Sequence, residues 1–244
     1  MEKTTEDDLA RYYIQGALDF HSLSGYGNFP EPPFNIGGVP SVDLLRSVGD
    51  QAAAEAEYRA LRALLSERRT RRRRGRRVSL PLLTSCLAVA AGRNEEDGSW
   101  PYPSAGNLRA VKVFLVAVDV PEAEAIYLFD PIRAEFDLCD SASKAGEQAA
   151  LGKRLLRTSA LDPHTVQALF LMVADLAKAG LRYGERSYRY ALLEAGHMAQ
   201  NLSLALSVAG VPCCPVGGID DQEVMDLLEI DESARIFLYG VAVP

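Results

Sequence analysis

The feature that most limits the possible folds is a long helical segment near the C-terminal end of the chain. Residues 187–210 read SYRYALLEAGHMAQNLSLALSVAG and are apolar on nearly every face of a helix. A helix of this kind is expected in a protein interior. With 244 residues, the chain can bury such a helix in one domain. No apolar run reaches the roughly 18 residues that a membrane span needs, so we expect a soluble globular protein.

The N-terminal residues and the cysteines bear on the cellular compartment. The chain begins MEKTTEDDLARYY, which is acidic and lacks the basic-then-apolar layout of a signal peptide. The four cysteines, Cys86, Cys139, Cys213 and Cys214, form no CxxC motif, and the chain has three histidines. No Cys/His cluster has the spacing of metal ligands. We therefore expect a cytoplasmic protein with reduced thiols and no metal site.

The remaining pattern predicts a mixture of helices and strands. Helices are expected over 1–25, 41–69, 80–91, 164–180 and 221–230, in addition to 187–210. Strands are expected over 111–118, 126–130, 134–138, 211–218 (with a turn) and 234–243. Residues 26–40 are rich in Pro and Gly and lack periodicity, as in a connecting segment. No GxGxxG motif or P-loop is present, so we expect an α+β or three-layer α/β fold, not a Rossmann fold.

Charge is concentrated in one short stretch. Residues 68–77 read RRTRRRRGRR, eight arginines in ten positions, while the whole chain carries a formal net charge of -7. The rest of the chain therefore carries -7 - 8 = -15. Nucleic-acid binding draws on many phosphate contacts over a wide surface, which this acidic chain does not offer. A single phosphate ester, held by two or three of these arginines, agrees better with the sequence.

Small residues stand directly before a predicted strand. Residues 103–107 read PSAGN, and the apolar run 111–118 is interrupted only by Lys112. A tight turn alone accounts for this composition. The other interpretation is that a ligand comes close to the backbone there, where bulky side chains would obstruct it. The short stretch by itself leaves both interpretations open.

Four motifs in the chain form a set: RRTRR at 68–72, PSAGN at 103–107, EAGHMAQNL at 194–202 and PVGG at 215–218. In this order they resemble the FMN-dependent nitroreductase superfamily. They resemble more closely its SagB-type dehydrogenase branch, the flavin oxidases that turn azolines in peptides into azoles. Thr70 replaces the serine of the family's RRSxR element. The resemblance covers about residues 62–243.

The resemblance implies a nitroreductase-like α+β fold, with a central, mostly antiparallel sheet flanked by helices, in a homodimer that holds FMN at the subunit interface. The implied FMN-binding residues are Arg68, Arg69, Thr70, Arg72, Pro103, Ser104, Ala105, Gly106, Asn107, Gly217 and Gly218. Arginine forks suit a phosphate, and the small residues allow close approach to a flat ring. Ser104 and Asn107 are expected at its polar edge. The remaining arginines of the run, Arg71, Arg73, Arg74, Arg76 and Arg77, are expected to be solvated.

The catalytic residues follow from the resemblance with one departure. Azoline-oxidising relatives carry a Lys-Tyr pair, thought to deprotonate the substrate, where this chain has Arg182 and Tyr183. A guanidinium remains protonated at any relevant pH and cannot act as a general base. We therefore expect Tyr183 to transfer the proton and Arg182 to act as an electrostatic helper. Glu194, His197 and Gln200 share a helix face, and we expect them to form a hydrogen-bonded seam in a buried helix.

These observations predict an N-terminal extension over 1–60 and an FMN-binding domain over 61–244. The predicted enzyme removes a proton and a hydride from a thiazoline or oxazoline in a peptide-like or carrier-bound substrate, and dioxygen reoxidises the flavin. Its expected partners are a second copy of the chain and a cyclodehydratase or peptide synthetase, with no membrane. The family's basic C-terminal tail has no counterpart before Pro244, which would leave more of the phosphate contact to Arg68 and Arg72.

Two alternatives remain open from the sequence. The first is an NAD(P)H-dependent nitroreductase or flavin reductase, whose bound flavin NADPH would bleach rapidly. The second is a non-catalytic protein whose arginine run holds an acidic peptide or another polyanion. A protein of the second kind would be colourless and would not take up FMN.

Overall fold

The computed structural model describes residues 52–121, 123, 126–139, 148–157, 159, 161–230 and 233–244. The expected helix over 1–25 and the connection over 26–40 lie outside these residues. The helix expected over 41–69 is described from residue 52, as α3 (Ala52–Glu67). The predicted boundary between residues 60 and 61 falls inside α3.

The described strands form one sheet of six, in the order β3-β2-β1-β4-β6-β5, and neighbouring strands are antiparallel. The strands are β1 (Val111–Ala117), β2 (Ile126–Asp130), β3 (Glu135–Leu138), β4 (Ala168–Asp175), β5 (Cys214–Val216) and β6 (Arg235–Val243). The structure confirms each predicted strand: 111–118 as β1, the hairpin 126–138 as β2 and β3, the short strand within 211–218 as β5, and 234–243 as β6.

The helix predicted over 164–180 is wrong. A short 3-10 turn (Pro163–Thr165) leads into β4, and only α6 (Ala177–Tyr183) is helical. β4 pairs with β1 on one side and β6 on the other, and the side chains from Ala168 to Ala174 are buried. A central strand covered on both faces has a continuous apolar sequence, so its periodicity does not differ from that of a buried helix.

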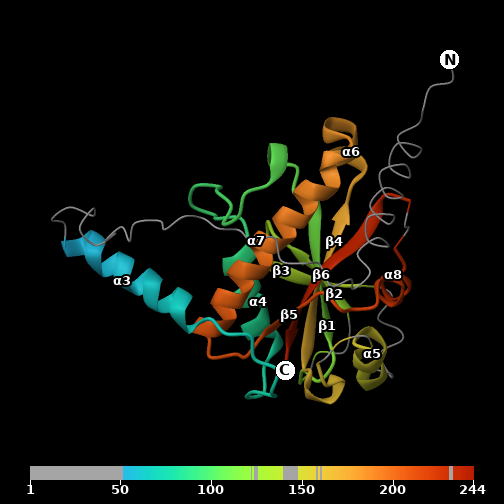
Figure 1. Cartoon of the computed structure of the whole chain (residues 1–244), viewed down its shortest axis with the longest axis horizontal. Helices are drawn as coiled ribbons and strands as arrows, with labels where there is room; N and C mark the ends of the chain where they lie inside the picture. The colour runs from blue at the N-terminus through green and yellow to red at the C-terminus, as the bar shows by residue number, and fades with distance from the viewer. Residues whose placement is uncertain are drawn as a thin grey trace, which may run out of the picture.

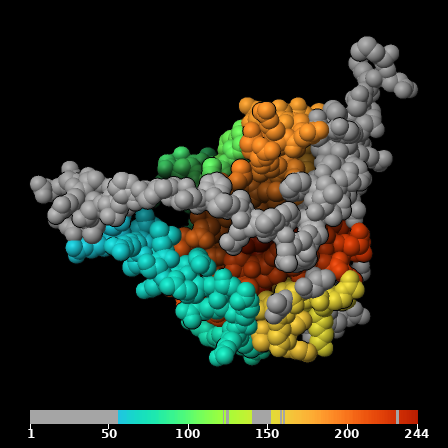
Figure 2. Space-filling model, in the orientation of Figure 1, coloured from blue at the N-terminus to red at the C-terminus, as the bar shows by residue number. Residues whose placement is uncertain are grey.

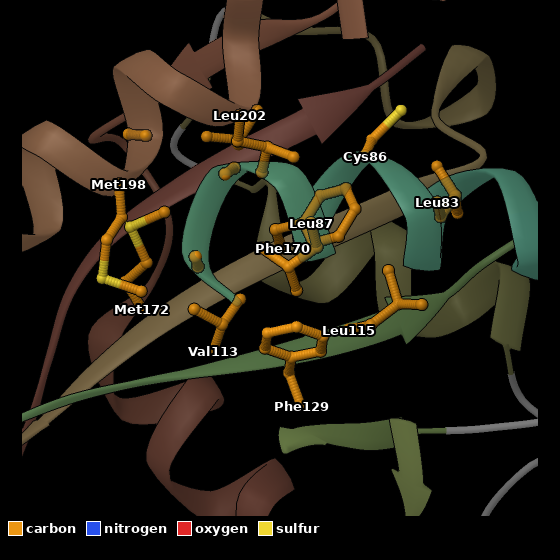
Figure 3. Packing of buried hydrophobic residues seen from close by; sticks show 14 of the residues in the cluster. Leu83, Cys86, Leu87, Val113, Leu115, Phe129, Phe170, Met172, Met198 and Leu202 are labelled. Atoms are coloured by element: carbon orange, nitrogen blue, oxygen red, sulfur yellow. The ribbon is translucent and has the colours of Figure 1, made fainter. Parts of the chain in front are cut away.

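Helices cover both faces of the sheet (Figure 1). α4 (Leu80–Ala91) and α7 (Arg186–Val208) lie on one face, and α5 (Gln148–Leu155) and α8 (Asp221–Leu228) on the other. In the core on the α4–α7 side, Leu115, Phe129 and Phe170 of the sheet point toward Leu87 and Leu202 of the helices (Figure 3). This three-layer arrangement with an antiparallel sheet confirms the predicted α+β fold class.

The long helix α7 is confirmed, but its expected burial on every face is wrong. One face, which includes Met198 and Leu202, is buried against the sheet and α4. Other apolar side chains of α7 are exposed, with Val208 at 73% and Leu193 at 52%. Because an apolar face exposed to water is unusual in a protein that works alone, this face is a candidate interface.

Gln167 fixes the end of the arginine run to the sheet. Its side chain is completely buried, accepts a hydrogen bond from the Val78 N–H (3.1 Å) and donates to the carbonyls of Arg76 (3.1 Å) and Pro244 (3.0 Å). The Gly75 N–H also donates to the Pro244 carbonyl (3.0 Å). These bonds hold residues 75–78 beside the last strand. The C-terminal end of the arginine run is therefore fixed to the sheet.

Candidate functional site

The arginine run lies beside the strand that leads to the PVGG turn. The Arg71 N–H donates to the Cys213 carbonyl (2.9 Å), and Thr70 forms a parallel bridge with Cys213. Arg68 acts electrostatically on the Cys213 thiol, and Arg72 acts on the Cys214 thiol. Burial raises the pKa of both thiols, and the neighbouring arginine partly offsets this rise. Arg68 and Arg72 are therefore brought to one corner, at the start of β5.

Three of the five arginines expected to be solvated have partners. Arg74 and Arg77 pair with Asp119, whose carboxyl pKa is lowered chiefly by the hydrogen bond from Arg74. Arg76 donates to the Ala209 carbonyl (2.6 Å) at the end of α7. These side chains are exposed, but they anchor the run to the fold. The expected exposure to solvent is therefore confirmed for all five, although these three also have partners in the fold.

A cavity of about 880 Å³ opens beside this corner. Its wall includes Arg69 and Arg71–Arg74 from the run, with Glu67 and residues 210–212, whereas Arg68 and Thr70 do not line it. Arg74 pairs with Asp119, and within the described residues no carboxylate forms an ion pair with the other four arginines of the wall. Clustered guanidinium groups without counterions attract an anion such as a phosphate.

The PVGG turn stands at the other end of the same short strand. From Cys214 to Gly217 the chain advances three residues, which is about 10 Å in an extended strand. A Cβ added to Gly217 would meet only the ring of Tyr239, at 4.0 Å, so no described atom of this chain requires a glycine there. The glycine leaves open space beside an exposed backbone. The cationic corner and this open turn therefore lie in line along β5.

The PSAGN turn has an unusual backbone. Gly106 (φ 58°), Asn107 (φ 59°) and Arg109 (φ 53°) all adopt the left-handed conformation, which costs about 1 kcal/mol or more for residues other than glycine. A Cβ on Gly106 would lie 2.4 Å from the Tyr183 hydroxyl and 3.0 Å from the Arg182 guanidinium. At this left-handed φ a larger side chain would be strained, and its Cβ would also displace the ends of Tyr183 and Arg182. The glycine therefore allows the PSAGN turn to lie against the predicted catalytic pair.

Tyr183 is enclosed by aromatic and cationic groups. Its ring meets that of Tyr190 edge to face, with 5.1 Å between the centroids, and the Arg182 guanidinium carbon lies 5.5 Å from its centroid. Tyr190 was not among the predicted site residues, although it stands seven positions after Tyr183 in the motif region. The arrangement holds the Tyr183 hydroxyl at the surface of the PSAGN turn.

The seam expected from Glu194, His197 and Gln200 is wrong for two of its three residues. Glu194 is buried and accepts a hydrogen bond from the Val111 N–H (3.1 Å), which fixes the start of β1. His197 and Gln200 are exposed. Because a helix turns by 100° per residue, three residues spaced by three drift off the buried face. Instead, Asn201 donates to the Pro101 carbonyl (2.9 Å) and holds the segment before the PSAGN turn.

The predicted site residues form two groups at opposite ends of α7. Gly106, Arg182 and Tyr183 lie together before the helix begins, and Arg68 and Arg72 lie at residues 213–214, after it ends. α7 has 23 residues and is therefore about 35 Å long. In Figure 2 the teal arginine run and the orange α6 occupy opposite ends of the face in view. The fold of one chain does not bring the two groups together.

No helix among the described residues combines the length and apolar character that crossing a membrane requires. Likewise, no three His, Cys, Asp or Glu side chains in the described part of the chain gather into a metal-binding group.

Comparisons with known proteins agree with this architecture. A relative from Methanocaldococcus jannaschii, described as putative nitroreductase MJ1384, is 28% identical over 157 residues, which cover 64% of this chain and 76% of the relative. A chain of the E. coli microcin synthetase McbBCD complex with truncated pro-MccB17 bound superposes with a TM-score of 0.66 and 18% identity, covering 99% of this chain and 97% of that one. A putative nitroreductase from Ralstonia eutropha gives a TM-score of 0.61 and 17% identity, covering 74% and 80%.

The match to a protein family covers most of the chain. Residues 65–243 match the model of the nitroreductase family, and this range contains all the motifs and all six strands described above. The chain therefore belongs to the nitroreductase family.

Proposed function

We propose that this protein is an FMN-dependent oxidoreductase that dehydrogenates an azoline ring in a peptide-like substrate. The observation that carries the proposal is the contact of the Tyr183 hydroxyl and Arg182 with Gly106 of the PSAGN turn. This contact gives the turn, which family members place against the flavin ring, a proton-transferring group beside it. A turn that served only to reverse the chain would not require this arrangement.

FMN suits the groups that this chain presents. Arg68, Thr70 and Arg72 would hold its phosphate at the start of β5, and the exposed turn that contains Gly217 and Gly218 would face the ring. The two places lie about 10 Å apart along β5, so an elongated ligand is needed to reach both. When bound, FMN supplies a two-electron acceptor for hydride. The chain would contribute backbone N–H donors of the PVGG turn, which would stabilise negative charge on the ring.

A second copy of this chain would complete the site. The two groups of site residues lie at opposite ends of α7, so one flavin touches both only if they come from different chains. The exposed apolar surface between α3, α4 and α7 supplies a contact area for this copy. It includes Val89 (72% exposed) and Val208 (73% exposed) and a groove of about 520 Å³. Figure 1 shows α3 extending away from the sheet, where it would be free to pack against a second chain.

Tyr183 is the proposed proton acceptor of the reaction. Azoline oxidation releases one hydrogen as hydride and one as a proton, and the two leave the same ring. A guanidinium group cannot accept a proton, so the Tyr183 hydroxyl beside Arg182 is the proposed acceptor. The close packing of Gly106, Tyr183 and Tyr190 would keep the hydroxyl oriented and exclude water from behind it.

The similarity to a microcin synthetase chain supports this choice of reaction class. That complex holds a truncated pro-peptide, and the likeness extends over nearly the full length of both chains. By analogy, this protein would work beside a cyclodehydratase or peptide synthetase that makes the ring. Two observations favour the second candidate, an NAD(P)H-dependent nitroreductase. Similar proteins are described as putative nitroreductases. In addition, Arg182 stands where the azoline oxidases have the lysine of their Lys-Tyr pair.

Cofactor release tests the proposal first. The purified protein is expected to be yellow and to release FMN, not FAD, on denaturation. Replacing Arg68 and Arg72 together by Ala should weaken flavin binding by about a hundredfold or more, since each charge-assisted hydrogen bond is worth about 1.5–3 kcal/mol. Chromatography of the released cofactor and fluorescence titration measure both.

The matched control replaces Arg77, which pairs with Asp119 and does not line the cavity, by Ala; flavin affinity should change little. Release of FAD, or unchanged FMN affinity in the Arg68/Arg72 variant, would refute the assigned phosphate corner. Rapid bleaching of the bound flavin by NADPH, without turnover of an azoline, would favour the nitroreductase candidate.

A further inference from the structure

Arg109 is the most densely bonded side chain around the PSAGN turn, and none of the motifs includes it. Its guanidinium carbon lies 4.4 Å from the ring centroid of Trp100 and 4.7 Å from that of Tyr102. Its Nη1 donates to the Tyr102 carbonyl (2.8 Å), and its Nη2 donates to Asn107 Oδ1 (2.7 Å). Its backbone N–H donates to Ser104 Oγ (3.0 Å). One residue therefore contacts both ends of the turn.

This arrangement is maintained against a cost. Arg109 has a left-handed backbone, and its buried Nε has no hydrogen-bond partner among the described residues. An unsatisfied buried donor and a left-handed backbone at a residue other than glycine both destabilise the folded chain. Strain of this kind collects at functional sites, where the surrounding structure holds a residue in place. The two aromatic faces and the two short hydrogen bonds of the guanidinium provide that support.

The contacts with Arg109 determine which atoms of the turn remain available. A guanidinium has donors only, so the Asn107 amide must direct its oxygen toward Arg109 and its Nδ2–H₂ group away. Ser104 Oγ already accepts the Arg109 N–H, which leaves its O–H free to donate. Within the described residues, neither of these two donors has an acceptor, and Asn107 is exposed.

We propose that Arg109 is a positioning residue that fixes the polarity of the PSAGN turn, so that Ser104 and Asn107 present only donors to an acceptor-bearing edge of the flavin ring. This inference rests on the proposed function. The carbonyl oxygens and unprotonated nitrogens of an oxidised flavin are acceptors, and they gain negative charge on reduction. A turn that presents donors would therefore favour the reduced form and raise the reduction potential.

The polarity can be tested separately from the integrity of the turn. Asn107→Asp keeps an oxygen for Arg109 but replaces the outward amide donor by a second oxygen. Flavin affinity should fall at least tenfold, the effect of one lost hydrogen bond to a charged or polarised group, and the reduction potential should fall. Fluorescence of Trp100, the one tryptophan in the chain, reports on the stacked guanidinium in the flavin-free protein and should not change.

Arg109→Gln and Arg109→Lys form the complementary pair. Both should change the Trp100 fluorescence and lower the flavin potential, because neither side chain can bond Tyr102 and Asn107 while lying against both the Trp100 and Tyr102 rings. If charge alone mattered, Arg109→Lys would behave as the unmodified protein, and that result would overturn the proposal. Arg154→Gln, which breaks an arginine–Glu223 contact between α5 and α8, is the control for the loss of a hydrogen-bonded arginine.

A double-mutant cycle shows whether Arg109 acts through Asn107. In the Asn107→Ala background, Arg109→Gln should produce no more than a small additional fall in potential. Fully additive shifts would overturn the positioning role and leave the proposed function intact. If the unmodified protein binds no flavin, the proposed function fails instead, which is a different result from any outcome of the cycle.

Discussion

At the scale of single residues, the site depends on side chains whose roles are set by their neighbours. Gly106 is a glycine because the Tyr183 hydroxyl and Arg182 occupy the space of a Cβ. Glu194 is buried because it accepts the N–H at the start of β1. Burial raises the pKa of Tyr102 to about 12, and the Glu194 charge adds to the rise, so Tyr102 remains a neutral support below Arg109.

Tyr183 carries the residue-scale prediction. Tyr183→Phe preserves the ring and its edge-to-face contact with Tyr190 but removes the only atom that can accept a proton. The protein should remain yellow and lose azoline oxidation by about a hundredfold or more, the usual effect of a lost acid–base group. Arg182→Lys should retain or raise the rate, because an amine can give up its proton. Steady-state turnover of a synthetic azoline peptide measures both.

Tyr127→Phe is the matched control, since Tyr127 lies in β2 and its ring packs on Phe136. It should turn over the substrate at the unmodified rate. An unchanged rate in Tyr183→Phe would exclude Tyr183 as the base, while the flavin assignment would stand.

At the scale of elements, the sequence predicted the helices whose first residues include a capping side chain or a proline. Asp220 accepts the Glu223 N–H at the start of α8, and Pro81 stands in the first turn of α4, so both helices were predictable. β4 was not, because a strand buried on both faces lacks the alternation that marks a half-exposed one. The burial of α7 was overestimated for a related reason. A helix with apolar residues at an interface and a helix with apolar residues in a core have the same sequence pattern.

The candidate site was predictable only as separate motifs. The arginine corner and the PSAGN turn follow from residue types, but their separation by the length of α7 does not. Arg109 could have been noticed as a cation two positions after Asn107, yet its role depends on Trp100 and Tyr102, which have no fixed spacing in a helix or strand. Contacts between a loop and its own flanking residues are set by the folded backbone, not by periodicity.

The cap of α8 gives an element-scale prediction, because α8 follows the PVGG turn directly. Asp220→Ala should lower the free energy of unfolding by about 1 kcal/mol at pH 7, the usual effect of losing an N-cap. The Arg157 contact and the Glu223 N–H lower the pKa of the Asp220 carboxyl. Its contribution is therefore present above its unfolded pKa of about 3.9 and is lost as the pH falls through the lower folded value.

Denaturant unfolding at pH 7 and at about pH 3 measures this dependence. Asp220→Asn, which keeps a capping oxygen without the charge, should lose less stability at pH 7 than Asp220→Ala. Equal stability of Asp220→Ala and the unmodified protein at pH 7 would show that the cap contributes nothing.

At the scale of the whole molecule, two observations converge on an assembly of two chains. The candidate site is divided between the two ends of a helix about 35 Å long. The surface along α3, α4 and α7 leaves apolar side chains exposed, among them Leu61, Leu65, Val89 and Val208. The proposed dimer would bury this surface and form each flavin site from two different chains.

Complementation between two inactive variants tests whether two chains share the flavin site. One variant, Arg68→Ala with Arg72→Ala, loses the phosphate corner, and the other, Ala105→Trp, obstructs the PSAGN turn without touching the Gly106–Tyr183 contact. In a mixed dimer one of the two sites receives both intact halves. Unfolding and refolding the two together should therefore restore about a quarter of the unmodified flavin content, from one good site in half of the dimers. If the mixture binds no more flavin than either variant alone, the site lies within a single chain, which contradicts a site shared by two chains.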